Sequence, residues 1–323
     1  MQIISQFIVF NINKWGRDKL KLVNLDQLDQ VIVQPLRQAL TNNDHINCLT
    51  NDDEDNWELS AAITALNSLN NPNLDDNEVL DTFDRHLYTI LQSGQTRCNS
   101  NFLGLAYGYT YLFQRINAIE KSFKALGYHT DGSKEDRLFV DMGCGVGALL
   151  VALRNLIENQ DFILNYRGYD IVQEVIEINS SLLKNIYPNN DVTTDLNCIE
   201  SFGKNDDIEI KHLIMVYSYI FSQDGIDDDA IDSFKERVDS LFKEFNLERF
   251  YIVYINISPS YYNENYKKFI NLLESDGYEV VWKREEAEAL SNKRLTKLSS
   301  LKEDLSSLPN SNVHCTVSEI RRV

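Results

Sequence analysis

The segment RLFVDMGCGVGALLVAL, residues 137–153, constrains the fold of this chain more than any other. It begins with a short apolar run of strand type, passes through three alternating glycines and continues with apolar residues at helical spacing. Glycine permits a tight turn and removes the side chain that would keep a ligand from the backbone. The following helix begins with unpaired N–H groups and the positive end of its dipole. The segment predicts a strand–turn–helix unit for a nucleotide-like or carboxylate-bearing ligand, the alternative being a turn that only packs closely.

From Arg137 onward, short apolar runs alternate with amphipathic helical stretches. This alternation predicts an α/β fold with a Rossmann-like, seven-stranded, mostly parallel sheet and helices on both faces. The last two strands, joined by the charged, Ser-rich stretch 285–311, form either a crossover or an antiparallel hairpin. The predicted strands are 137–142, 162–170, 190–195, 212–221, 249–258, 278–284 and 312–322, and the predicted helices are 147–159, 172–186, 198–203, 227–246 and 261–275.

Residues 1–130 have a different pattern. Glycine is rare there, and apolar residues recur at steps of three and four, with Pro35 as a break or kink. The first eight residues suit a strand or a short docking segment. We therefore expect a helical N-terminal domain, 1–130, that caps the site or recruits a partner or substrate, followed by a ligand-binding domain, 131–323.

Composition limits the partners of the chain. It has 49 Asp and Glu against 31 Lys and Arg, a net charge of −18, and basic runs no longer than a pair or triplet. Such a surface repels phosphate backbones, which disfavours free nucleic acid as a partner. The five cysteines are scattered, without metal-ligand spacing, and their odd number fits a reducing cytosol. No apolar stretch approaches the roughly 20 residues of a membrane span. We expect a cytoplasmic protein without a metal site.

Two classes of ligand compete for the glycine turn. The string GCGVGA can be read as the GxGxxA of a dinucleotide site, but Asp141 stands where dinucleotide folds usually continue an apolar strand. The string VDMGCGVGALL resembles motif I of the class I S-adenosylmethionine-dependent methyltransferases, an apolar strand followed by acid-x-Gly-x-Gly-x-Gly. In that family the acid and the glycines surround the methionine part of the cofactor. The resemblance implies S-adenosylmethionine as the cofactor, with Asp141, Gly143, Gly145 and Gly147 beside it.

The ends of the next two strands extend this resemblance. NYRGYDIV brings Asp170 and Ile171 to the end of the second strand, where an acid accepts both ribose hydroxyls in either ligand class. In the methyltransferases an acid or amide after the third strand lies near the adenine amino group, with an apolar neighbour against the ring. Asp195 and Leu196 match that position. The alternative role for Asp195 is that of a polar turn residue that caps a following helix. Three acids at successive strand ends favour the methyltransferase over the dehydrogenase.

The stretch MVYSYIFSQDGIDDD follows the fourth strand, whose end usually faces the methyl group in the family. Tyr217 is a cofactor-binding candidate here, with a core aromatic as the alternative, and Ser218 and Tyr219 are the catalytic candidates. The Asn/Asp-Pro-Pro-Tyr/Phe motif of amino-methylating nucleic-acid enzymes is absent from the sequence. The paired cysteines of pyrimidine-C5 enzymes are absent too, so the catalytic base stays open.

A segment before the glycine turn supplies substrate candidates. RCNSNFLGLAYGYTYLFQRINAIEKSF precedes the motif, and in many methyltransferases the corresponding segment lies over the cofactor. Asn101, Tyr107 and Tyr111 are candidates by position, although tyrosines at this spacing also suit a helix interface or a core. Gly104 and Gly108, four residues apart, would permit close approach to another helix or to a ligand.

Three functions follow from these patterns. The leading one is an S-adenosylmethionine-dependent methyltransferase acting on a protein or small molecule. The second is a catalytically inactive binding or scaffold protein that keeps the fold. The third is an NAD-dependent oxidoreductase, for which Asp195 would be dispensable.

Overall fold

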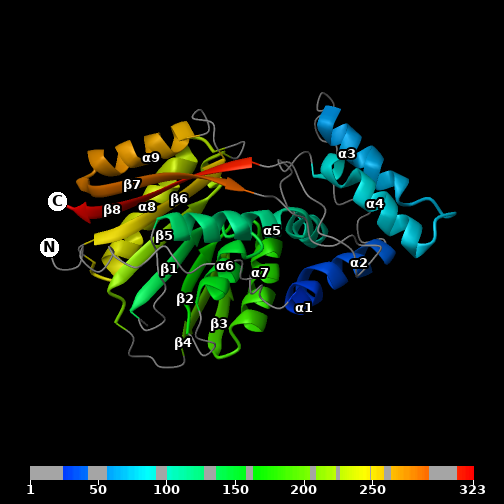
Figure 1. The fold of residues 1–323 in the computed structure, drawn as a ribbon, viewed down its shortest axis with the longest axis horizontal. Helices are drawn as coiled ribbons and strands as arrows, with labels where there is room; N and C mark the ends of the chain where they lie inside the picture. Colours follow the sequence, from blue (N-terminus) through cyan, green and yellow to red (C-terminus); the bar gives the residue numbers. More distant parts are fainter. Residues whose placement is uncertain are drawn as a thin grey trace, which may run out of the picture.

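The computed structural model describes residues 25–42, 57–91, 100–126, 136–157, 163–203, 209–222, 226–247, 249–257, 263–290 and 311–323. These residues form one eight-stranded sheet with helices on both faces (Figure 1). The strand order is β3-β4-β2-β1-β5-β6-β8-β7. The strands are β1 (Arg137–Met142), β2 (Asn165–Tyr169), β3 (Asn190–Asp195), β4 (Cys198–Gly203), β5 (His212–Ser218), β6 (Arg249–Ile257), β7 (Tyr278–Leu290) and β8 (Ser311–Arg322).

The centre of the sheet is parallel. Strands β2, β1, β5 and β6 pair in parallel, and Met142 at the end of β1 lies between Tyr169 and Tyr217. The carboxyl ends of these strands therefore meet at one edge, which also carries the glycine turn. The helices in this half of the chain are α6 (Ala148–Leu156), α7 (Gln173–Ile186), α8 (Asp228–Glu244) and α9 (Glu264–Ser275). α6 and α7 pack on one face of the sheet, and α8 and α9 pack on the other.

The prediction of a seven-stranded, mostly parallel sheet is wrong in its count and in its pairing. Of the seven pairings in the described sheet, three are parallel and four antiparallel. β8 lies between β6 and β7 and is antiparallel to both, so the hairpin alternative for the last two strands is the correct one.

The predicted helix at 198–203 is the strand β4. Its residues alternate between half-buried and buried along the strand, a period of two that marks a strand, and Asn197 has a φ of +58°. Leu196 and Asn197 form a two-residue turn that pairs Asp195 with Cys198. β4 thus lies antiparallel between β2 and β3, where a parallel strand was expected.

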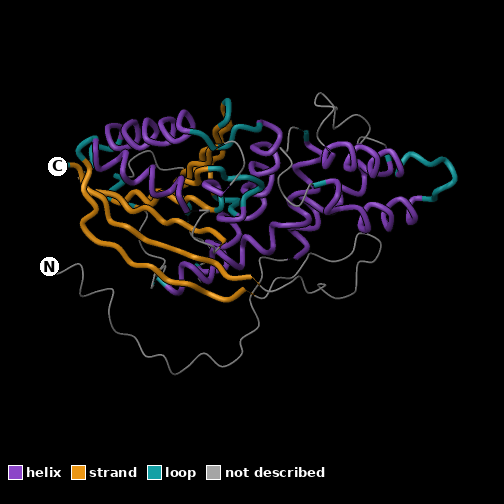
Figure 2. The backbone as a smooth tube through the Cα atoms, turned by 90° about the horizontal axis from the view of Figure 1, so that it is seen from above, coloured by secondary structure: helices purple, strands orange, loops and turns teal. Residues whose placement is uncertain are grey.

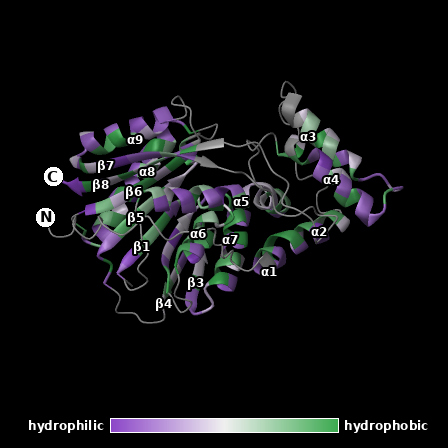
Figure 3. Ribbon diagram, viewed as in Figure 1, coloured by the Kyte–Doolittle hydropathy of each residue, from purple (hydrophilic) through white to green (hydrophobic). Residues whose placement is uncertain are grey.

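The described residues of the N-terminal part are mostly helical, as expected, but share a hydrophobic core with the sheet. The elements are α1 (Leu25–Leu28), the π-helical segment Asp29–Val33, α2 (Gln34–Thr41), α3 (Trp57–Ser68), α4 (Asp76–Ile90) and α5 (Asn101–Ala125). Most of their buried hydrophobic residues belong to the same cluster as those of α6 and α7, and green, hydrophobic residues appear along the segment from α1 to α2 in Figure 3. A separate helical domain is therefore not confirmed, and the boundary at 130 stays a prediction. The first eight residues lie outside the described part of the chain.

Helix α5 crosses one face of the sheet. It packs on α6 and α7 and continues toward β6, β7 and β8, while α3 and α4 project away from the sheet (Figures 1 and 2). Within the described residues, no helix is long and apolar enough to cross a membrane. The course of α5 matters for function because it brings α5 next to the glycine turn.

Candidate cofactor-binding site

The glycine turn joins β1 to α6 and is fixed to the end of β2. Gly143, Gly145 and Gly147 have φ values of +70°, +50° and +93°, a region that other residues enter only at a cost. The N–H groups of Gly143 and Cys144 both donate to the carbonyl oxygen of Tyr169, at 2.8 and 2.9 Å. The three glycines therefore produce the backbone course that the sequence predicted.

The three glycines face different surroundings. A Cβ on Gly143 would lie 2.7 Å from Cδ1 of Ile220, and one on Gly147 would lie 3.1 Å from Cδ2 of Leu182. A Cβ on Gly145 would meet no atom of the described residues within 4 Å. The outer two glycines thus permit close packing, whereas Gly145 presents bare backbone to open space, where a ligand can approach it.

Asp170 follows β2 and reaches back to the turn. Its Oδ2 accepts from the N–H of Gly145 at 3.0 Å, and its Oδ1 accepts from the N–H of Val172 at 3.1 Å. Burial raises the pKa of Asp170, and these backbone donors oppose that rise. An ionised carboxyl group has about four acceptor positions, so hydroxyl groups of a ligand can bind alongside the two backbone donors.

Asp141 lies beneath the turn. Its side chain is 2% exposed, its Oδ2 lies 3.4 Å from the Tyr166 hydroxyl, and burial raises its pKa to about 7. Nδ2 of Asn179 donates to the Gly145 carbonyl at 3.1 Å. Sequence reasoning missed Tyr166 and Asn179; the signal for Asn179 was a polar residue on the apolar face of α7. Asn179 Nδ2 also lies 3.4 Å from the Tyr166 hydroxyl, so Asp141 is linked to the turn through Tyr166 and Asn179.

Three other predicted residues lie beside Asp170: Ile171, Asp195 and Leu196. Ile171 and Leu196 are 83% and 76% exposed. Apart from the C-terminal Val323, they are the most exposed large hydrophobic residues in the described part of the chain. The N–H of Asp170 donates to the Asn197 carbonyl at 3.2 Å, which holds the β3–β4 turn next to Asp170. Asp195 is exposed at the end of β3, and the next element is the strand β4, so Asp195 does not cap a helix. Two exposed apolar side chains next to carboxylates suit a flat heterocycle with polar edges.

Tyr217 does not join this group. It is fully buried in the aromatic cluster under α8 and α9, with ring centroids 5.3 Å from Phe221 and 5.2 Å from Phe269. Side chains alternate along β5, and that of Tyr217 points to the sheet face opposite α5 and α6. The core interpretation applies, which corrects its assignment as a cofactor-binding residue.

Ser218 and Tyr219 end β5 in different ways. Ser218 is half-buried, whereas Tyr219 is buried, has a φ of +65° and donates its N–H to the Ile255 carbonyl at 2.7 Å. The Arg115 guanidinium covers the Tyr219 ring, with Cζ 3.4 Å from the centroid. Burial raises the pKa of Tyr219, so the phenol stays neutral near pH 7 and is a poor general base.

The substrate candidates on α5 lie at two places. Asn101 is exposed at the first residue of the helix, and Tyr107 and Tyr111 contact each other further along it, with ring centroids 4.9 Å apart. Nη2 of Arg115 donates to the Tyr107 hydroxyl at 3.2 Å. Sequence reasoning missed Arg115, although it is the first charged residue of α5 and follows a largely apolar and aromatic run.

The glycines of α5 explain its approach to the turn. A Cβ on Gly108 would lie 3.2 Å from Cγ2 of Val146, and one on Gly104 would lie 2.9 Å from Cδ1 of Ile178. The prediction that this pair permits close helix packing is confirmed. Through Val146, α5 contacts the glycine turn itself.

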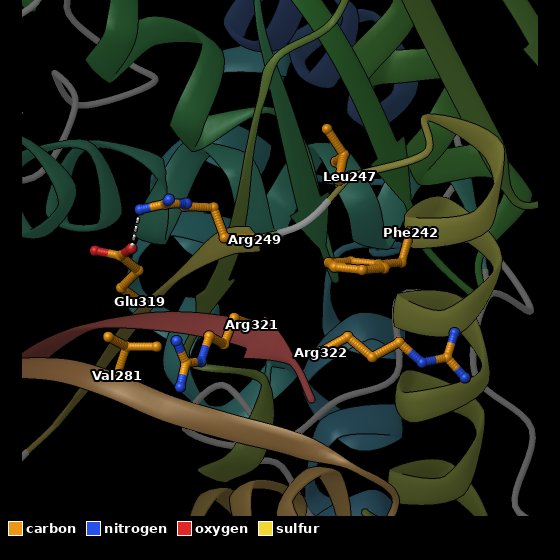
Figure 4. Close-up of a pocket in the computed structure, with 7 residues that line it drawn as sticks. All are labelled: Phe242, Leu247, Arg249, Val281, Glu319, Arg321 and Arg322. Atoms are coloured by element: carbon orange, nitrogen blue, oxygen red, sulfur yellow. Dashed lines mark hydrogen bonds and ion pairs between the residues drawn. The ribbon is translucent and has the colours of Figure 1, made fainter.

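A pocket of about 430 Å³ lies elsewhere (Figure 4). Residues at the beginning of β6 and the end of β8 line it, at the end of the strands opposite the glycine turn. Two of its arginines are neutralised, since Arg249 pairs with Glu319 at 2.9 Å and Arg321 with Glu279 at 2.6 Å.

In the described part of the chain, no three His, Cys, Asp or Glu residues form a metal-binding group. The glycine turn is therefore the better candidate site.

Comparison with known proteins finds matches among solved structures. No family model and no curated protein matches the chain. The solved structures include M. jannaschii TYW2 in complex with AdoMet, at 17% identity over 64% of this chain and 77% of that one, with a TM-score of 0.32. They also include a human methyltransferase 10 domain containing protein, at 10% identity over 62% and 80% with a TM-score of 0.33. A third is the type I restriction-modification methyltransferase subunit of Streptococcus thermophilus, at 12% identity over 91% and 66% with a TM-score of 0.28.

The three TM-scores are all below 0.5. The resemblance to class I S-adenosylmethionine-dependent methyltransferases is based instead on the topology of this structure. It has the β1–glycine turn–α6 unit, the parallel centre β2-β1-β5-β6 and an antiparallel β8 between β6 and the edge strand β7. At the level of the fold the resemblance is confirmed, with no family within it identified.

Proposed function

We propose that this chain binds S-adenosylmethionine at the carboxyl edge of β1, β2 and β3 and transfers its methyl group to a protein or small-molecule acceptor. One observation carries the proposal: the Asp170 carboxylate is bonded to the N–H of the one turn glycine that faces open space, at 3.0 Å. A ligand that binds against the backbone of Gly145 would therefore also contact the Asp170 carboxylate.

The neighbouring residues match the parts of such a ligand. Asp170 would accept the ribose hydroxyls, and the exposed side chains of Ile171 and Leu196 would lie against the adenine ring, with Asp195 near its amino group. The backbone of Gly145 would lie beside the methionine part. Bound S-adenosylmethionine supplies an electrophilic methyl group on a sulfonium.

The chain itself contributes alignment and exclusion of water. Methyl transfer is an in-line displacement, so holding donor and acceptor in register lowers the barrier without a strong base. Tyr219, neutral near pH 7 and covered by Arg115, shapes the end of β5 and does not remove a proton.

A catalytically inactive cofactor-binding protein is the second candidate. The observation that favours it is at the end of β5, where the Tyr217 ring packs against Phe221 and the Tyr219 ring packs against Arg115. This alternative keeps the cofactor site and predicts binding without turnover.

Calorimetric titration with S-adenosylmethionine, S-adenosylhomocysteine and NAD tests the proposal. We expect binding of the first two and none of NAD. Binding of NAD alone would establish the oxidoreductase alternative, and no binding of any of the three would overturn the proposal. Transfer of labelled methyl from S-adenosylmethionine into cell-extract proteins or small molecules would then separate the enzyme from the inactive binder.

A further inference from the structure

Arg115 is a cation in an apolar setting. It lies on α5 between buried helix residues, and its Nη1 is buried with no hydrogen-bond partner among the described residues. The side chains that act electrostatically on it are the phenols of Tyr107 and Tyr219. Glu120, the acid that follows it on α5, is buried and bonded by Nδ2 of Asn155 at 2.6 Å. Because a guanidinium keeps its charge in proteins, the described part of the chain leaves this cation without a carboxylate.

The two tyrosines fix the orientation of the guanidinium. Its Cζ lies 3.4 Å from the Tyr219 ring centroid, a cation–π geometry, and Nη2 donates to the Tyr107 hydroxyl at 3.2 Å. Tyr219 has a φ of +65°, a conformation that residues other than glycine rarely adopt. One edge of the guanidinium is thus engaged, and Nη1 is left to bind something else.

The cluster lies next to the cofactor site. Ile220, the residue after Tyr219, would be 2.7 Å from a Cβ on Gly143, and Val146 of the same turn packs against Gly108 of α5. The parallel pairing places β5 on the opposite side of β1 from β2. Arg115 is therefore on the side of the turn away from Asp170.

We propose that Arg115, oriented by Tyr107 and Tyr219, is a carboxylate-binding subsite beside the glycine turn. A guanidinium in a site of low dielectric constant binds a carboxylate through charge-assisted, often bidentate hydrogen bonds. This inference rests on the proposed function. Two groups have the required chemistry: the carboxylate of the cofactor's methionine part and a carboxylate on the acceptor.

Binding measurements separate these sources. S-adenosylhomocysteine carries the carboxylate and 5′-methylthioadenosine lacks it. If the subsite holds the cofactor, Arg115→Met weakens S-adenosylhomocysteine binding at least ~10-fold, the loss expected for a charge-assisted hydrogen bond, and leaves 5′-methylthioadenosine binding unchanged. Arg154→Met is the matched control, since Arg154 also faces a tyrosine ring, 6.0 Å from that of Tyr187; both affinities should be unchanged.

Acetate is the probe for an acceptor carboxylate. If the subsite faces the acceptor, acetate raises the melting temperature of the S-adenosylhomocysteine-loaded wild type, and the effect is absent in Arg115→Met. If it holds the cofactor, acetate instead competes with S-adenosylhomocysteine and not with 5′-methylthioadenosine. If Arg115→Met does not fold, Arg115→Lys takes its place in these measurements. Lysine keeps the charge but cannot form two parallel hydrogen bonds to a carboxylate, so its affinity for the carboxylate should be intermediate.

The inference is overturned if wild type binds both nucleosides, acetate has no effect in either titration and Arg115→Met keeps both affinities. Failure of the proposed function has a different signature, because neither nucleoside would then bind the wild type.

Discussion

At Gly145 a missing side chain has two roles, since it allows a φ of +50° and leaves the turn open above the backbone. We expect Gly145→Ala to fold, with a loss of about 1 kcal/mol from the left-handed conformation, and to lose most of its S-adenosylmethionine affinity because Cβ fills the ligand's approach. Thermal unfolding and calorimetry measure the two effects. Gly277→Ala is the matched control: it has a φ of +86° and only an ordinary contact with the Val323 carbonyl, so it should be strained but bind normally.

Asp170 also has a structural role that the sequence did not show. Because its two oxygens accept from Gly145 and Val172, Asp170→Ala leaves two N–H groups without these acceptors. We expect complete loss of measurable S-adenosylmethionine binding together with about 1–3 kcal/mol of lost stability. Unfolding in denaturant and calorimetry test this, and unchanged cofactor affinity in the folded variant would show that the ligand does not use Asp170.

The buried carboxyl of Asp141 predicts a pH dependence. Burial raises its pKa to about 7 in the folded chain, so folding favours the protonated form. This contribution to stability is fully present below the unfolded pKa near 4 and is lost as pH rises through about 7. Asp141→Asn, which imitates the protonated carboxyl, should gain stability relative to wild type between pH 5 and pH 8. Melting curves that shift in parallel for both proteins would contradict the raised pKa.

At the scale of elements, the contact of α5 with α7 depends on Gly104. A Cβ there would already lie 2.9 Å from Ile178 and 3.3 Å from Val175, so Gly104→Val must push the two helices apart. We expect a loss of about 1–3 kcal/mol, measured as a lower melting temperature. Ala61→Val, at a half-buried position of α3, controls for the poor helix propensity of valine.

The elements that sequence predicted well are those with a strong local signal. β1 begins and ends as expected because its apolar run stops at a glycine turn, and α7 and α8 differ from their predicted bounds by a residue or two because their apolar spacing is regular. β4 was missed because CIESFG is too short to separate strand from helix by periodicity, and because one of its two partners, β2, lies on the other side of α7 in the chain. Tyr166, Asn179 and Arg115 were missed because buried polar residues acquire roles through tertiary contacts that no local pattern contains.

At the scale of the whole molecule, charge sets the partners. A chain with net charge −18 repels polyanions over its surface, and its far-edge arginines are paired with acids. We expect no binding of free tRNA or single-stranded RNA at physiological salt, as judged by gel mobility. A salt-sensitive complex under the same conditions would point to a basic surface in residues that the structure does not describe.

The order of the strands also has a consequence for how the molecule assembles. β3 and β4 are joined by a two-residue turn and can pair as soon as both are made, whereas β1 must wait for β5, with Val140 opposite Met215. Contacts between distant residues form slowly because loop closure costs entropy before it is rewarded. The hairpin is thus expected to form early and the parallel centre late. Since the glycine turn leads out of β1, the site would be completed last, and a nascent chain could not hold its ligand until the centre of the sheet had closed.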